Sequence, residues 1–203
     1  MTVEKGRDWG SAGALPEDGV IVRSDAEARA VVTAARRAGE EVPPLGLLGG
    51  DLCRTVGGRG DEARLRSNVA ARLNVDLGSV LMDGRLHWFV AHLVTRRGWL
   101  LGPLFGAFNA QWLGPWDVAP RAHPGDGQLE IVEVTMSAGD RLKARSRLAT
   151  GTQVPHPGIR IRRADALQWD VPKGHAVWLD GERVGPATTL SIRVEPDGLR
   201  VVV

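Results

Sequence analysis

Residues 20–51 read VIVRSDAEARAVVTAARRAGEEVPPLGLLGGD, and this stretch decides the fold of the N-terminal part. Its β-branched opening is followed over 26–38 by a segment rich in Ala, Glu and Arg, with apolar residues at helical spacing, which Gly39 ends. Two prolines and a second apolar run, 45–48, come next. A strand, a helix and a strand within about 30 residues predict a βαβ unit with a parallel sheet.

The pattern changes after residue 61. A short helix is expected at 62–73, and the Asp83-Gly84 dipeptide between apolar runs 75–82 and 86–94 predicts a hairpin. Further strands are expected at 129–134, 159–163, 176–179, 190–194 and 199–203, the last two joined by a turn at 195–198, with one helix at 139–149. The sequence therefore predicts α/β plus all-β: a truncated α/β domain over residues 1–66, then an antiparallel β-sandwich over 67–203.

Composition excludes several classes of protein. The chain has 203 residues, 43% of them hydrophobic, which is enough for a hydrophobic core. Its net charge of only +2 disfavours a protein that wraps nucleic acid. The single Cys53 excludes an intramolecular disulfide or a cysteine-based zinc site. Residues 1–10 have no apolar core of a signal peptide, and Pro103 with several polar residues interrupts the apolar stretch 98–116. We expect a soluble, cytoplasmic protein.

Glycines and aspartates mark a first candidate site. Gly49, Gly50 and Asp51 follow a buried strand, and consecutive glycines let backbone N–H groups approach an anion closely. An ordinary strand-to-helix turn explains the same three residues. Asp126 lies in a second turn, 123–127, that suits a hard cation such as Mg²⁺, and a plain turn is again the alternative.

A third turn carries two acids. Asp180 and Glu182 stand one residue apart at the end of a strand and could supply a general base and its partner, or form a solvated hairpin tip. His87, His92 and His175 lie in strand-like contexts and are interpreted as packing residues.

Residues 141–163 contain seven Lys and Arg, Arg145, Arg147 and Arg162 among them, and no acid. Anionic lipid headgroups attract such segments, whereas a charged, solvated face is the other interpretation. No motif of a sequence-specific nucleic-acid reader accompanies this basic segment, so no nucleic-acid partner is expected.

Several short motifs follow one another from about residue 18 to the end of the chain. They are Asp76-Leu77-Gly78, Asn109, Ala119-Pro120-Arg121-Ala122, Asp126-Gly127, Leu129-Glu130-Ile131-Val132, His156-Pro157-Gly158-Ile159, Leu179-Asp180-Gly181-Glu182 and 194–201. In this order they resemble the motifs of the bacterial diacylglycerol kinase and lipid kinase family, including its "APxA…DGxLDVV", "HPxV" and "LDGE…VxPxALRV" stretches.

The resemblance implies a function and its residues. Members transfer the γ-phosphoryl group of ATP to a lipid hydroxyl with Mg²⁺, between an α/β nucleotide domain and a β-sandwich. By resemblance Asp180 would be the general base with Glu182 beside it. Asp126 would stand at a structural metal site, helped by a carbonyl such as that of Leu129. Few acids could suffice, because phosphoryl transfer asks mainly for positioning and charge neutralisation.

The nucleotide loops depart from the family. Where members have Gly-Gly-Asp-Gly-Thr after the first strand, residues 23–27 read RSDAE and retain only Asp25. The next loop, "PLGTGND", is shortened to Gly49-Gly50-Asp51; in another register, residues 48–51 would be the remnant of the first loop. Three hypotheses follow. The chain is an active ATP-dependent kinase with a site that a homodimer could complete, an inactive member that binds lipid or a partner protein, or a structural or regulatory domain without a ligand. The expected partner of the first two is a lipid substrate or an anionic membrane surface, and a peripheral position at the inner membrane face is compatible with both.

Overall fold

The computed structural model describes residues 9–98, 102–148 and 156–203, with side chains left out for 144–148. In the described residues, seven strands form one sheet in the order β1-β4-β15-β3-β2, with β5 on β4 and β12 on β15, and six form a second sheet, β11-β10-β7-β6-β13-β14. Strands β8 (Trp112–Leu113) and β9 (Trp116–Asp117) make a separate hairpin. No helix among the described residues has the length and apolar character to cross a membrane.

The predicted βαβ unit is confirmed. Strands β2 (Val20–Val22) and β3 (Leu45–Leu47) pair in parallel, and α1 (Asp25–Ala38) connects them. Ser24 caps the start of α1 by accepting the Glu27 N–H, and Gly39 ends it in the left-handed conformation. The apolar face of α1 is buried in the hydrophobic core of the α/β part, in one cluster with Leu45, Leu47 and Leu52.

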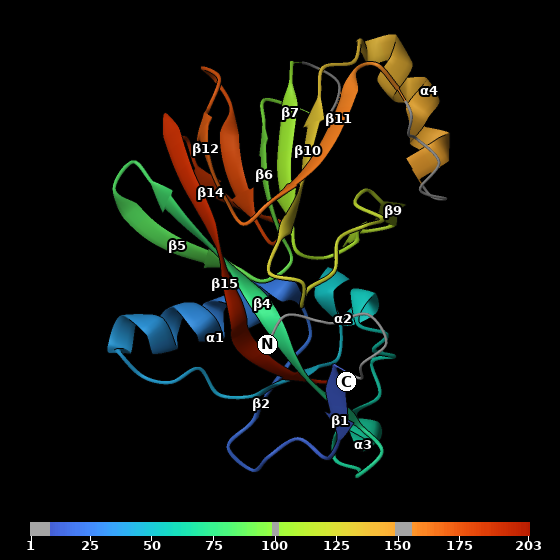
Figure 1. Ribbon diagram of the computed structural model, residues 1–203, viewed down its shortest axis with the longest axis vertical. Coiled ribbons are helices and arrows are strands. Elements are labelled where there is room, and N and C mark those ends of the chain that lie inside the picture. Colours follow the sequence, from blue (N-terminus) through green and yellow to red (C-terminus); the bar gives the residue numbers. More distant parts are fainter. Residues whose placement is uncertain (1–8, 99–101, 149–155) are drawn as a thin grey trace.

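Two long strands connect the α/β part with the sandwich (Figure 1). Strand β4 (Ala71–Met82) pairs antiparallel with β15 (Thr189–Val202), and the far end of β15 pairs in parallel with β3. The C-terminal strand therefore completes the N-terminal sheet. The proposed division at residue 66 remains a prediction.

One predicted turn is wrong. The runs 190–194 and 199–203 belong to a single strand, β15, because both pair antiparallel with β4 in one direction. The Glu195–Gly198 segment between them is an irregularity of the register rather than a reversal of the chain.

The antiparallel sandwich is confirmed as well. Besides β2, β3, β4 and β15, the first sheet contains β1 (Gly10–Ala12), β5 (Arg85–Phe89) and β12 (Ala166–Asp170). The second sheet contains β6 (His92–Arg96), β7 (Leu104–Phe108), β10 (Leu129–Val134), β11 (Ile159–Ala164), β13 (Ala176–Leu179) and β14 (Glu182–Gly185). The core between the sheets is apolar and includes Phe89, Phe105, Ile131, Leu179 and Ile192.

Three further expectations need correction or completion. The helix expected at 62–73 is only α3 (Glu62–Leu65), because β4 already begins at Ala71. The run 86–94 is not one strand: β5 belongs to the first sheet and β6 to the second. The helix expected at 139–149 is present as α4 (Ala138–Leu148), and a short helix, α2 (Asp51–Thr55), follows β3.

Candidate functional site

Two aspartates stand where parallel strands end. Asp25 is the first residue of α1, after β2, and Asp51 is the first residue of α2, after β3. The carboxyl ends of parallel strands are where α/β proteins bind ligands. Asp25 accepts the backbone N–H of Asp51 at 2.5 Å and that of Leu52 at 3.1 Å, so its carboxylate ties the two strand ends together.

The two glycines before Asp51 permit this close approach. Gly50 has φ of +98°, and a Cβ there would lie 2.4 Å from Asp25 Oδ1. A Cβ on Gly49 would lie 2.4 Å from the carbonyl oxygen of Arg23. The glycines therefore admit the chain's own carboxylate and carbonyl groups to the loop.

Asp180 reaches the same region from the sandwich. It sits at the tip of the β13–β14 hairpin with φ of +50°, and its side chain has no exposed surface. Its carboxylate accepts the backbone N–H groups of Val90, Ala91 and His92 at 3.0, 2.8 and 3.1 Å. Those amides point at Asp180 instead of a neighbouring strand, which is why the run 86–94 breaks between β5 and β6.

His92 joins Asp51 to this group. Its Nε2 lies 3.0 Å from Asp51 Oδ2, and the ring is almost fully buried. Among the described residues, no hydrogen-bond partner meets His92 Nδ1. The backbone N–H of Gly114, in the β8–β9 hairpin, donates to both oxygens of Asp51 at 3.0 Å. The Arg54 guanidinium holds that hairpin against α2, since it lies 3.3 Å from the Trp112 ring centroid and donates to the Gly114 carbonyl.

Arg29 supplies a positive charge one helical turn after Asp25. Its Nε lies 3.8 Å from Asp180 Oδ2, and its Nη2 bonds Glu182 Oε2. Glu182 is largely exposed, whereas Asp180 is buried, so the guanidinium bridges an outer and an inner carboxylate. We call Asp25, Asp51, His92 and Asp180, with Arg29 and Glu182, the carboxylate cluster.

Burial shapes the acid–base properties of the cluster. Burial, and then the charge of Asp180, raises the pKa of Asp25 to about 6, against the lowering effect of the Asp51 and Leu52 amides. Burial also raises the pKa of Asp180, although His92 and three backbone amides act to lower it. For His92 burial favours the neutral form, but the hydrogen bond to Asp51 and the charges of Asp180, Asp51 and Asp25 together raise its pKa. Such shifts are typical of functional sites.

Most residues singled out in the sequence converge here. Asp25, Gly49, Gly50, Asp51, Asp180 and Glu182 come from segments far apart in the chain and meet in the cluster. Sequence reasoning missed Arg29 and took His92 for a packing residue. The i+4 spacing of Arg29 from Asp25 was a usable signal, whereas only the pairing of β6 and β13 brings His92 to Asp180.

Asp126 lies at a different place. Its Oδ1 accepts the Gln128 N–H at 3.0 Å, and its Oδ2 lies 3.1 Å from Arg163 Nη1. Leu129 is fully buried in the sandwich core. The Arg163 guanidinium already stands against the carboxylate that a Mg²⁺ ion would bind, and a cation there would meet a like charge. With Arg163 in this position the carboxylate is already paired with a cation, and the metal role of Asp126 stays a prediction.

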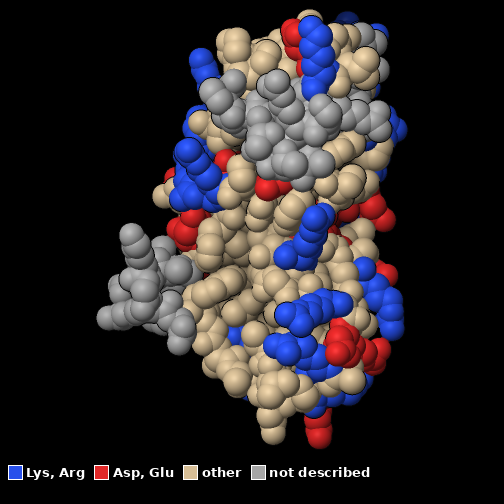
Figure 2. All heavy atoms as spheres, turned by 90° about the vertical axis from the view of Figure 1, so that its right-hand side faces the viewer, with Lys and Arg blue, Asp and Glu red and all other residues tan. Residues whose placement is uncertain are grey.

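Of the three predicted surface arginines, Arg162 pairs with Glu133 at 3.5 Å on the second sheet. Arg145 and Arg147 belong to α4, but their side chains lie outside the described residues. Figure 2 shows the side of the molecule on the right of Figure 1, where Lys and Arg side chains lie in several groups and acidic side chains lie beside some of them.

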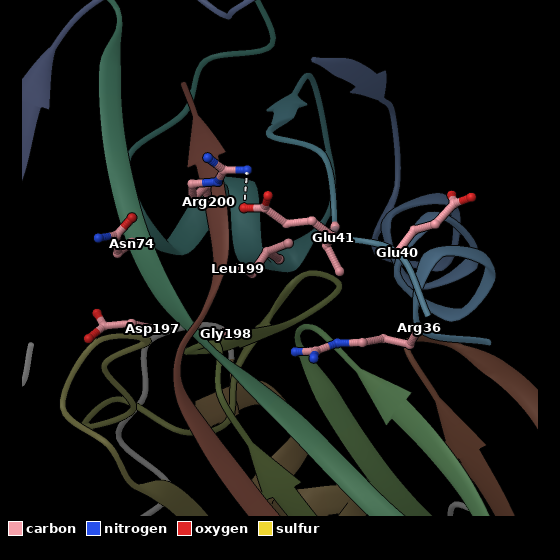
Figure 3. Close-up of a pocket in the computed structure, with 9 residues that line it drawn as sticks. Arg36, Glu40, Glu41, Asn74, Asp197, Gly198, Leu199 and Arg200 are labelled. Atoms are coloured by element: carbon pink, nitrogen blue, oxygen red, sulfur yellow. Dashed lines mark hydrogen bonds and ion pairs between the residues drawn. The ribbon is translucent and has the colours of Figure 1, made fainter. Parts of the chain in front are cut away.

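A pocket of about 280 Å³ lies beside the irregular segment of β15 (Figure 3). It shares no residue with the carboxylate cluster. Charged groups line it, and they pair within the chain: Arg200 with Glu41 at 2.9 Å, and Arg36 with Glu195 at 2.8 Å. The remaining lining residues are Glu40, Val42, Asn74, Asp197, Gly198 and Leu199.

Comparisons with known proteins agree with this architecture. Residues 102–203 match the family described as the YegS C-terminal NAD kinase beta sandwich-like domain. No curated protein matches the chain in sequence. A Bacillus anthracis str. Sterne protein assigned as a diacylglycerol kinase superposes with a TM-score of 0.68 at 15% identity, covering 91% of this chain and 77% of its own.

Another structure, of a diacylglycerol kinase from the same organism, gives a TM-score of 0.63 at 15% identity, covering 91% of this chain and 75% of its own. At these identities the two structures show the shared fold. The family match spans half of the chain and includes the Asp180 hairpin. The chain therefore belongs to the family that carries the YegS-type C-terminal, NAD kinase-like β-sandwich.

Proposed function

We propose that the chain transfers a phosphoryl group from ATP to a lipid hydroxyl at the carboxylate cluster. One observation carries this proposal: Asp25, Asp51 and Asp180, from three separate segments, meet within one buried hydrogen-bonded group. Burying several carboxylates together is unfavourable unless they are hydrogen-bonded, paired with a cation or protonated, and clusters of this kind are typical of functional sites.

Asp180 is proposed as the general base. Burial raises its pKa, so it holds a proton more strongly than an exposed aspartate does. Three backbone N–H groups fix its carboxylate in one orientation. Because its side chain is not exposed, the hydroxyl proton would reach it through one water molecule or after the Arg29–Glu182 pair moves. Glu182, exposed beside it, would orient Arg29 toward incoming phosphate.

A second candidate is a family member that binds lipid or a partner protein without catalysis. The loop that should cradle phosphate favours it: the Asp51 and Leu52 amides are already bound by Asp25, and the Arg23 amide donates to Glu27 at 2.8 Å. An incoming phosphate would have to displace these carboxylates. For this candidate we propose an anionic membrane surface as the ligand of the basic segment 141–163.

A transfer assay separates the two candidates. Purified protein is incubated with Mg·ATP labelled at the γ-phosphate and vesicles that contain diacylglycerol, and labelled lipid is measured. The active-kinase proposal expects transfer that falls at least about a hundredfold in Asp180→Asn, the usual scale for loss of a general base. The control variant Asp170→Asn, on the exposed edge of β12, should retain wild-type transfer.

The absence of transfer in folded wild-type protein would contradict the kinase proposal. The second candidate then expects salt-sensitive co-sedimentation with anionic vesicles and its loss when Arg145, Arg147 and Arg162 are all changed to Glu. Unchanged sedimentation of that triple variant would contradict the proposed role of the basic segment.

A further inference from the structure

We propose that Asp25, Asp51 and His92 form a binding site for a divalent transition-metal ion such as Mn²⁺ or Zn²⁺. The site is separate from the turn at Asp126 where the family resemblance implies magnesium. It also does not depend on whether the chain transfers phosphate, because it rests on the position of three side chains.

The geometry is close to that of a ligand set. Among the described residues, one carboxylate oxygen each from Asp25 and Asp51 and one ring nitrogen of His92 lie within 4.8 Å of one another. His92 Nε2 and Asp51 Oδ2 are 3.0 Å apart. Two ligand atoms that sit at right angles about 2.1 Å from a metal ion lie about 3 Å from each other. The His92–Asp51 pair therefore already has the spacing of two ligands of one ion, and Asp25 completes the set by moving toward that ion.

Charge favours a cation at this point. Asp25, Asp51 and Asp180 are three carboxylates in or beside the site, and the nearest fixed cation, Arg29, is shared with the outer Glu182. Buried carboxylates need a partner of opposite charge or a proton. A divalent ion supplies two positive charges where the structure provides less than one for each acid.

The imidazole decides the class of metal. Mg²⁺ and Ca²⁺ prefer oxygen ligands alone, whereas one histidine with carboxylates suits Mn²⁺, Fe²⁺ or Zn²⁺. The His92 ring is almost fully buried, and its Nε2 points at Asp51. Asp51 Oδ2 accepts the Nε2 proton in this structure, so a metal ion that binds Nε2 displaces that proton, as metal binding to histidine does in general. Nδ1 has no hydrogen-bond partner among the described residues, and in the metal-bound form it carries the proton of the neutral imidazole.

The rigidity of the ligands supports binding. Asp25 and Asp51 each open a helix that follows a parallel strand, and His92 begins β6. A Gly114 N–H on Asp51 fixes that carboxylate, as outer hydrogen bonds do in metal sites. Asp51 is the most exposed of the three, which gives an ion a way in.

Titration of chelator-treated wild-type protein with MnCl₂, followed by electron paramagnetic resonance, tests the site without ATP. ZnCl₂ titration by calorimetry is the parallel measurement. We expect one saturable ion per chain and at least about a tenfold weaker affinity in Asp51→Asn and in His92→Gln. The matched controls His87→Gln and Asp126→Asn change the same residue types outside the site and should bind as the wild type does.

The wild type also provides a test that needs no substitution. Mn²⁺ bound here must broaden the amide NMR signals of Asp51 and His92 before those of Gly127 and Gln128, at the Asp126 turn. The reverse order, no saturable binding, or equal affinity in folded Asp51→Asn and His92→Gln would each overturn the metal site. Because no lipid or nucleotide is present, failure of the kinase proposal leaves these results unchanged.

Discussion

The Asp25 carboxylate fills the space in front of the Gly50 α-carbon, where a Cβ would lie 2.4 Å from Asp25 Oδ1. Gly50→Ala must therefore move the carboxylate from the Asp51 and Leu52 amides that it binds, in addition to straining a backbone with φ of +98°. Positive φ alone costs a non-glycine residue about 1–2 kcal/mol. We expect Gly50→Ala to lower the free energy of unfolding by about 2–4 kcal/mol.

Gly57→Ala is the matched control, because Gly57 has φ of +82° and open space around it. Chemical denaturation of both variants isolates the contact with Asp25. Equal losses of stability in the two variants would show that Asp25 does not depend on the missing side chain of Gly50.

Stability should depend on pH through Asp25. Its pKa is raised from 3.8 to about 6, so between these values the folded state binds more protons than the unfolded state. The free energy of unfolding contributed by this group therefore falls as pH rises from about 4 to 6, by on the order of 1–3 kcal/mol. The raised pKa of Asp180 acts in the same direction.

Asp25→Asn removes the titration. We expect the variant to show a flatter stability profile between pH 4 and 6.5 than the wild type, measured by urea denaturation at closely spaced pH values. Glu17→Gln is a control, since Glu17 is an exposed acid away from the cluster. Parallel profiles for wild type and Asp25→Asn would argue against a raised pKa at this position.

Local sequence signals were sufficient for the N-terminal unit. Ser24, Gly39 and the spacing of apolar residues along 26–38 act within a few residues of one another, and the helix and the flanking parallel strands follow from them. The opposite outcome at 195–198 has a physical cause. Pro196 with Asp197-Gly198 is typical of a turn, but a β-bulge also admits proline and glycine, and only pairing with the distant β4 decides between them.

The candidate site was partly predictable for a similar reason. Motif residues such as Asp51 and Asp180 are visible in sequence because they lie in Gly-Asp turns. The contact of His92 with Asp51 depends on the crossing of two sheets, and no local pattern in the 86–94 run marks it. The Arg163–Asp126 pair is equally non-local, since it needs the antiparallel alignment of β10 with β11.

Arg29 should stabilise the fold through the buried carboxylate it faces. Arg29→Met keeps most of the stem and removes the charge 3.8 Å from Asp180, so we expect a loss of about 1–3 kcal/mol at pH 8. The loss should become smaller as pH falls, because burial raises the Asp180 pKa and a protonated Asp180 needs no cation. Arg36→Met is the control: its pair with Glu195 is partly exposed, and such pairs contribute less than about 1 kcal/mol. Equal losses in both variants at pH 8 would contradict this role of Arg29.

Arg163 occupies the place of a cation at the Asp126 turn, which predicts how the protein responds to magnesium. In the wild type, the Arg163 guanidinium lies 3.1 Å from Asp126 Oδ2 and its Nη2 also bonds the Arg121 carbonyl. We expect the melting temperature of the wild type to change by less than about 1 °C between EDTA and 5 mM MgCl₂, because Arg163 already pairs with the Asp126 carboxylate.

Removal of the guanidinium in Arg163→Ala leaves the half-buried Asp126 beside Asp76 without that partner. This variant should melt lower in EDTA and regain part of the difference in MgCl₂ or CaCl₂. Arg162→Ala, the neighbour that pairs with Glu133, should show no such recovery. A wild type that magnesium stabilises as strongly as Arg163→Ala would show that the guanidinium does not replace a cation.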